Sequence, residues 1–89
     1  MAKAVMMHVY GDVQGVGFRA RIKSIALAFG VFGYVRNLPD GSVEIHVEGD
    51  DDRVNAFVET IKSLREFDIW EVKIKETSIK NYNEFFIIP

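Results

Sequence analysis

The stretch Gly11-Asp12-Val13-Gln14-Gly15-Val16-Gly17-Phe18-Arg19 decides how the rest of the chain is interpreted. It lies between an apolar, strand-like run, Val5 to Tyr10, and the amphipathic helix pattern that follows it. A glycine-rich turn between a strand and a helix directs backbone N–H groups toward the helix N-terminus, where an anion such as phosphate binds. The stretch therefore predicts an anion-binding loop.

The charges that follow the loop support this prediction. Arg19, Arg21 and Lys23 stand at the start of the predicted helix, where the helix dipole disfavours cations. We expect an anion at this end of the helix, with Arg19 reaching across it. Arg21 and Lys23 are expected to be solvated, with a steering role at most.

The composition limits the class of protein. The 89 residues suit one small domain, 1–89, and 48% apolar with 27% charged residues is typical of a globular chain. A net charge of −2 gives no general attraction to nucleic acid or to an anionic membrane. The chain has no cysteine, which excludes disulfides and thiolate catalysis. Without a signal peptide or a long apolar run, we expect a cytoplasmic protein.

Hydrophobic periodicity predicts an α+β fold. The expected elements are a strand over Val5 to Tyr10, a helix ending at Gly30, a strand over Tyr34 to Leu38, a turn at Leu38 to Gly41, a half-buried strand over Val43 to Glu48, a helix over Asp50 to Leu64, a strand over Trp70 to Lys75 and a possible short strand over Phe85 to Ile88. The order β-α-β-β-α-β predicts a ferredoxin-like two-layer sandwich with an antiparallel-dominated sheet and both helices on one face.

This topology predicts where Asn37 lies. A right-handed crossover makes the first and second strands parallel, so their C-terminal ends lie at the same edge of the sheet. The glycine-rich loop follows the first strand, and Asn37 stands near the end of the second. We therefore expect the Asn37 amide to lie close to the loop, although Asn favours turns and could simply begin the hairpin.

Two motifs together carry a family resemblance. The segment Gly11 to Arg19 resembles the first signature of the acylphosphatases, and the segment Gly33-Tyr34-Val35-Arg36-Asn37-Leu38-Pro39-Asp40-Gly41-Ser42-Val43, followed by Gly49, resembles the second. Two long motifs at suitable spacing are far more specific than a single Gly-x-Gly. With the length and the order of elements, the likeness covers nearly the whole chain.

The resemblance implies an enzyme that hydrolyses the carboxyl–phosphate bond of acyl phosphates without a metal. We expect no cofactor, and nothing in the sequence demands more than a monomer. The resemblance also implies Arg19 as the catalytic residue that binds the phosphate and Asn37 as the catalytic residue that orients the attacking water. The other residues it places at the substrate phosphate are Gln14, Gly15, Val16, Gly17 and Phe18. The sequence departs from the family pattern at Asp12, usually basic, and at Leu38, a hydroxyl residue in some members.

Other interpretations remain open at this point. The fold also suits a non-catalytic binding module, or a domain that senses phosphate or acyl phosphate, because fold alone does not decide function. RNA binding is disfavoured, since Ser42 to Glu48 offers acids and a histidine where an RNA-binding sheet shows aromatic and basic residues. His8 and His46 are expected to be solvated rather than metal-binding, and the aromatic residues are expected in the core.

Overall fold

The computed structural model describes all residues, 1–89. Its elements are β1 (Ala2–Asp12), α1 (Phe18–Phe29), β2 (Phe32–Asn37), β3 (Val43–Asp50), α2 (Asp51–Lys62), β4 (Asp68–Thr77) and β5 (Phe85–Ile88). The predicted order is confirmed, and the terminal strand is present with the expected bounds. The first strand is longer than its apolar run, because pairing with β3 and β4 extends it in both directions.

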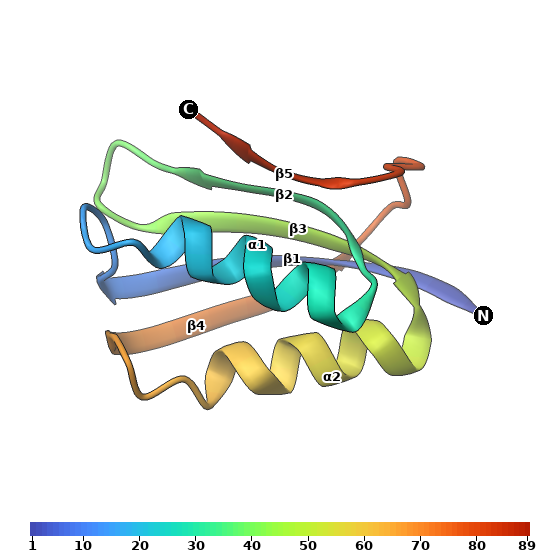
Figure 1. Cartoon of the computed structure of the whole chain (residues 1–89), viewed down its shortest axis with the longest axis horizontal. Helices are drawn as coiled ribbons and strands as arrows, with labels where there is room; N and C mark the ends of the chain where they lie inside the picture. Colours follow the sequence, from blue (N-terminus) through green and yellow to red (C-terminus); the bar gives the residue numbers. More distant parts are fainter.

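The sheet has the strand order β4-β1-β3-β2-β5. The pairs β1–β3, β1–β4 and β2–β3 are antiparallel, and β2–β5 is parallel. Both helices lie on the same face of the sheet (Figure 1). The predicted α+β, ferredoxin-like two-layer sandwich is therefore confirmed.

The topology brings the loop after β1 and the turn after β2 to one end of the sheet. Since β1 and β2 are both antiparallel to β3, they run parallel to each other. Figure 1 shows the β1–α1 connection and the β2–β3 turn at the same, left-hand end of the sheet, and β5 running toward that end. We call this end the loop end of the sheet.

The two helices begin in different ways. Asp50 caps α2, accepting a 3.0 Å hydrogen bond from the N–H of Asp52, and the first turn carries Asp51 and Asp52. By contrast, α1 begins after Gly17, which has no side chain to cap the helix, and its first turn has no acidic residue. The positive end of the α1 dipole therefore has no capping side chain and no acidic residue of the protein beside it.

The core lies between the helices and the sheet. It includes Phe18, Ile22 and Ile25 of α1, and Phe57 and Ile61 of α2. Phe18 is 1% exposed and its ring contacts that of Phe67 edge-on, with centroids 5.0 Å apart. The side chain that begins α1 is therefore fixed in the core, which holds the preceding loop in place.

The central strand β3 is buried on both faces, which corrects the expectation of a half-buried strand. His46 is 1% and Glu48 3% exposed, because the segment between β4 and β5 crosses this face and hydrogen-bonds to Glu48. The expectation of solvated histidines is wrong for His46, which lies 2.7 Å from Glu48. It is wrong in part for His8, whose half-buried ring lies 3.3 Å from Glu44.

Trp70 corrects the expectation that the aromatic residues all lie in the core. The pairing of β1 with β4 shifts register between Tyr10 and Gly11, where β4 has one extra residue. Such a bulge re-aims a side chain, and Trp70 is 72% exposed. Neither helix combines the length and the apolarity needed to cross a membrane.

A row of polar side chains crosses the sheet face that the helices leave free. His8, Glu44 and Arg36 are direct cross-strand neighbours. Glu44 accepts a 2.6 Å hydrogen bond from Arg36 Nε and a 3.0 Å bond from the Tyr34 hydroxyl. Burial raises the pKa of Glu44, but these hydrogen bonds and the Arg36 charge outweigh it and lower the pKa from its usual 4.5. Burial and the bond to Glu44 raise the pKa of Tyr34 to about 12.

The replacement Glu44→Gln should make stability less dependent on pH in acid. A carboxyl whose pKa is lower in the folded chain stabilises that state above its unfolded pKa, and the contribution is lost as the pH falls through the folded value. At pH 7 we expect the variant to be about 1 kcal/mol less stable, below the usual range for a charged hydrogen bond because Arg36 is exposed. Urea unfolding of the natural chain and the variant at pH 7 and at pH 3 measures the difference in their stability. An equal difference at both pH values would contradict the prediction.

Candidate active site

The loop of residues 13–17 connects β1 to α1 in an unusual backbone conformation. Gly15 and Gly17 have φ values of 74° and 81°, in the left-handed region that glycine adopts at no steric cost. A Cβ atom at either position would meet no other atom within 4 Å. The glycines are therefore explained by backbone conformation and not by close packing.

The N–H groups of Gly15 to Arg19 donate no hydrogen bond within the protein. The first N–H groups of any helix lack an intrahelical partner, and here the preceding loop extends the run of free donors. Gly15, Val16 and Gly17 are exposed, whereas Phe18 is anchored in the core. Successive free N–H groups at a helix N-terminus form an anion site.

A pocket of about 200 Å³ opens beside these N–H groups. It is lined by Val13, Gly15, Gly17, Phe18, Arg19, Ala20 and Ile87. Most of these residues belong to the motif that the sequence singled out. Ala20 follows the motif directly, whereas Ile87 comes from β5, and no local pattern could have placed it here.

The Arg19 side chain is held by the last strand. Its Nη1 donates a 2.9 Å hydrogen bond to the carbonyl oxygen of Ile88. No other hydrogen bond or ion pair within the protein involves the guanidinium, which has five N–H donors in all. Arg19 is thus oriented by β5 and keeps several donors for a ligand.

Asn37 ends β2 on the core side of the sheet. Side chains alternate between the two faces along a strand, and Val35 lies in the core while Arg36 lies on the free face. Asn37 therefore returns to the core side, where its cross-strand partner is the buried Val43. The Asn37 Oδ1 atom is buried and accepts no hydrogen bond. A buried acceptor without a partner within the protein is rare, so this oxygen is free to accept a hydrogen bond from a ligand or water.

The strand register brings the ends of β2 and β5 together. Ile88, whose carbonyl holds Arg19, pairs with Arg36, the neighbour of Asn37. Gln14 joins the loop to the turn that follows Asn37, since its Nε2 lies 2.9 Å from the carbonyl oxygens of both Leu38 and Ser42. The loop, the end of β2 and the end of β5 therefore form one continuous constellation.

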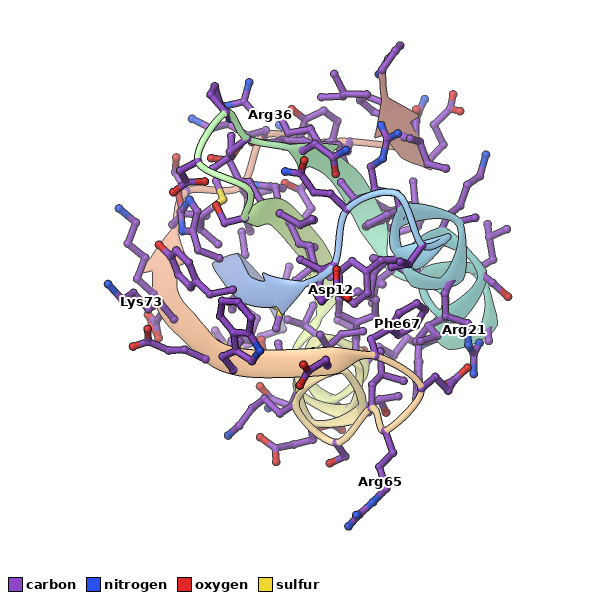
Figure 2. The ribbon with its side chains drawn as sticks, turned by 90° about the vertical axis from the view of Figure 1, so that its left-hand side faces the viewer. Asp12, Arg21, Arg36, Arg65, Phe67 and Lys73 are labelled. Carbon is purple, nitrogen blue, oxygen red and sulfur yellow. The ribbon has the colours of Figure 1, made fainter.

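The other predicted charges lie outside this constellation. Arg21 is exposed, as expected, and forms a 3.0 Å ion pair with Glu66. Looking onto the loop end, Figure 2 shows Phe67 between Asp12 and Arg21, with Arg36 and Lys73 on the side of the sheet away from α1. Asp12 is exposed at the end of β1, where it pairs in register with Asp68.

Comparison with known proteins identifies the family. The acylphosphatase family model matches residues 5–88. The chain belongs to the acylphosphatase family. It is 42% identical over 87 residues to an acylphosphatase of Methanospirillum hungatei, with 96% of each chain covered.

Two solved structures are similar to this acylphosphatase-family chain. The crystal structure of acylphosphatase from Bacillus subtilis matches with a TM-score of 0.90 and 33% identity, covering 100% of both chains. The crystal structure of full-length HypF in the phosphate- and nucleotide-bound form matches with a TM-score of 0.88 and 30% identity, but only 12% of that longer chain is covered. The fold, the family and the class of enzyme predicted from the two motifs are thus confirmed, and the roles of individual residues stay predictions.

Proposed function

We propose that the chain hydrolyses acyl phosphates with the phosphoryl group seated in the 13–17 loop, against Arg19, and with the attacking water held by Asn37. The observation that carries the proposal is the run of free N–H groups from Gly15 to Arg19 beside a guanidinium with unused donors. Both adjoin the end of the strand that carries the unpartnered Asn37 oxygen.

The loop and Arg19 bind the phosphoryl oxygens. The transition state of phosphoryl transfer spreads negative charge over three equatorial oxygens, and catalysis depends on positioning and charge stabilisation. Preorganised backbone N–H groups accomplish this without a reorganisation cost. The planar guanidinium of Arg19 adds a charged pair of donors whose geometry matches two oxygens of a phosphate.

Asn37 orients the water. Its carboxamide both accepts and donates hydrogen bonds; the Oδ1 atom accepts one from the water and so directs an oxygen lone pair toward phosphorus. The water oxygen forms the new P–O bond, and the bond between phosphorus and the acyl oxygen breaks, with its electron pair leaving on the carboxylate. The water proton passes to a phosphate oxygen.

The substrate itself makes further catalytic groups unnecessary. The leaving carboxylate has a conjugate acid with a pKa of about 4, so it departs without a general acid. The phosphate oxygens can take the proton of the water, so a protein base is dispensable too. A site composed of N–H groups, one guanidinium and one carboxamide is therefore sufficient.

Turnover of benzoyl phosphate tests this function against phosphate sensing. We expect catalytic hydrolysis in the presence of a chelator, with benzoate and inorganic phosphate released in equal amounts over many turnovers. Saturable binding of phosphate by a folded chain, with hydrolysis no faster than in buffer, would favour the sensor instead.

Gln14→Ala should separate the loop from the β2–β3 turn. It removes hydrogen bonds to the Leu38 and Ser42 carbonyls, so we expect about 1–2 kcal/mol lower stability and a severalfold higher KM for benzoyl phosphate. Gln14→Glu should be worse, since a carboxylate cannot donate to either carbonyl. Urea unfolding and steady-state kinetics measure both effects; an unchanged KM in both folded variants would show that this link does not shape the site.

A further inference from the structure

The segment of residues 78–84, here called the crossover segment, connects the two edge strands of the sheet. It leaves β4 at the end opposite the loop end and reaches the start of β5 beside β2 (Figure 1). It lies over the free face of β3, where its backbone meets the buried Glu48. The segment contains Asn81, the one non-glycine residue with positive φ, at 64°.

Glu48 holds this segment through both of its oxygens. Oε1 accepts a 2.8 Å hydrogen bond from the N–H of Lys80, and Oε2 accepts a 3.0 Å bond from the N–H of Tyr82. His46 Nε2 lies 2.7 Å from the same Oε1. Burial raises the pKa of Glu48, but these bonds outweigh it and lower the pKa below its usual 4.5. The carboxylate therefore fixes the segment on both sides of Asn81.

Aromatic contacts of Tyr82 also hold the crossover segment against the free face of the sheet. The Tyr82 ring meets His46 edge-on with centroids 5.2 Å apart, and Phe86 at 5.6 Å. Tyr34 stacks on His46 from β2, with 5.7 Å between centroids and 12° between planes. Tyr82 is thus fixed both by its N–H and by its ring.

The position of the crossover segment decides where β5 begins. Only three residues separate Asn81 from Phe85, the first residue of β5. The carbonyl oxygen of Glu84 accepts a 3.0 Å hydrogen bond from Gly33, which starts the pairing with β2. Because β5 has four residues, its far end lies within about 13 Å of its start, and that end is the Ile88 carbonyl that holds Arg19.

We propose that Glu48 is a positioning residue for the phosphate site, which acts by fixing the crossover segment and, through β5, the Ile88 carbonyl that orients Arg19. The inference rests on the proposed role of Arg19 in binding phosphate. A slip of one residue in β5 would move the Ile88 carbonyl by about 3.3 Å and invert its strand face. The Arg19 bond, 2.9 Å long, cannot survive such a shift.

The binding of inorganic phosphate, followed by phosphorus-31 NMR, tests the proposal on the full chain. Glu48→Gln keeps the shape but places an NH₂ group against one of the two backbone N–H donors, so β5 loosens while the core remains. We expect phosphate to bind about five- to tenfold more weakly, as when a charged hydrogen bond is weakened rather than removed. The matched control is Val58→Ala, which destabilises α2 away from the crossover segment and should leave phosphate affinity unchanged.

Combination with Arg19→Ala shows whether the effect passes through Arg19. We expect Glu48→Gln to have no further effect on phosphate affinity in that background, because there is no guanidinium left to position. An equal loss in both backgrounds would overturn the proposal, as would unchanged affinity in folded Glu48→Gln. If Arg19→Ala itself leaves affinity unchanged, the proposed function of Arg19 fails, and this inference with it.

Asn81→Ala provides a second variant if Glu48→Gln does not fold. Asn81 is exposed, and alanine tolerates its left-handed conformation poorly, so the crossover segment should loosen without loss of the fold. We expect the same direction of change in phosphate affinity, smaller in size and absent in the Arg19→Ala background. Unchanged affinity in this variant would overturn the proposal by itself.

Discussion

Arg19→Ala is expected to lower kcat/KM for benzoyl phosphate by about a thousandfold, the upper range for removing one preorganised donor to a developing oxyanion. Here the donor is also charged and forked, and its loss leaves the phosphoryl oxygens to backbone N–H groups alone. Both kcat and KM should worsen, because in the proposed mechanism the guanidinium contacts the phosphate in the ground state and more strongly in the transition state. Steady-state kinetics with a chelator present measures the change.

Two further variants make this expectation specific. Arg19→Lys should recover only part of the activity, since a lysine ammonium lacks the planar pair of donors. Arg21→Ala removes the same charge from the same helix, but Arg21 is exposed and paired with Glu66, so we expect activity within about twofold of the natural chain. A folded Arg19→Ala protein with near-normal kcat/KM would remove Arg19 from the mechanism.

Asn37→Ala is expected to lower kcat by about 10²- to 10³-fold and to leave the binding of inorganic phosphate nearly unchanged. In the proposed mechanism the Asn37 amide holds the water and not the phosphate, and misplacement of a reacting group by about 1 Å costs roughly a hundredfold in rate. A lower kcat with unchanged phosphate affinity distinguishes Asn37 from Arg19, whose loss should reduce both kcat and phosphate affinity. Steady-state kinetics for kcat and phosphorus-31 NMR for phosphate affinity measure the two effects separately.

The stability of the Asn37 variant provides an independent check. Because Oδ1 is buried and unpartnered, its removal costs the fold no hydrogen bond at that atom, and stability should be unchanged or slightly higher. Asn55→Ala is the matched control, an amide on α2 that accepts a bond from Lys3 at the surface; its activity should be normal. Loss of folding in Asn37→Ala would assign the residue a structural role in place of a catalytic one.

Local patterns were enough to predict most of the fold. The Gly30 stop and the acidic helix start at Asp50 depend on neighbouring residues alone. The structure has Gly30 at φ 69°, and Asp50 stands one residue before α2 as its cap, bonded to the N–H of Asp52. The parallel relation of β1 and β2 followed from crossover geometry. Because of that relation, the sequence predicts Asn37 at the loop end of the sheet.

The errors arose where residues distant in sequence decide the environment. Alternation along β3 could not reveal that residues 78–84 cover its polar face, so His46 and Glu48 looked solvated. The bulge that exposes Trp70 depends on the register with β1. Ile87 and the Ile88 carbonyl reach the site only through the pairing of β5 with β2, and an apolar C-terminal run carries no sign of such a role.

The most direct measurement of the central claim is a titration of the chain with inorganic phosphate, followed through the backbone amide signals in ¹H–¹⁵N spectra. We predict saturable shifts confined to the N–H groups of Gly15 to Arg19 and to the Arg19 side chain, with the same pattern in Asn37→Ala and with saturation only at much higher phosphate in Arg19→Ala. Shifts centred elsewhere, such as on Lys73 and Lys75 of β4, or none at saturating phosphate, would contradict the assignment of the phosphate site.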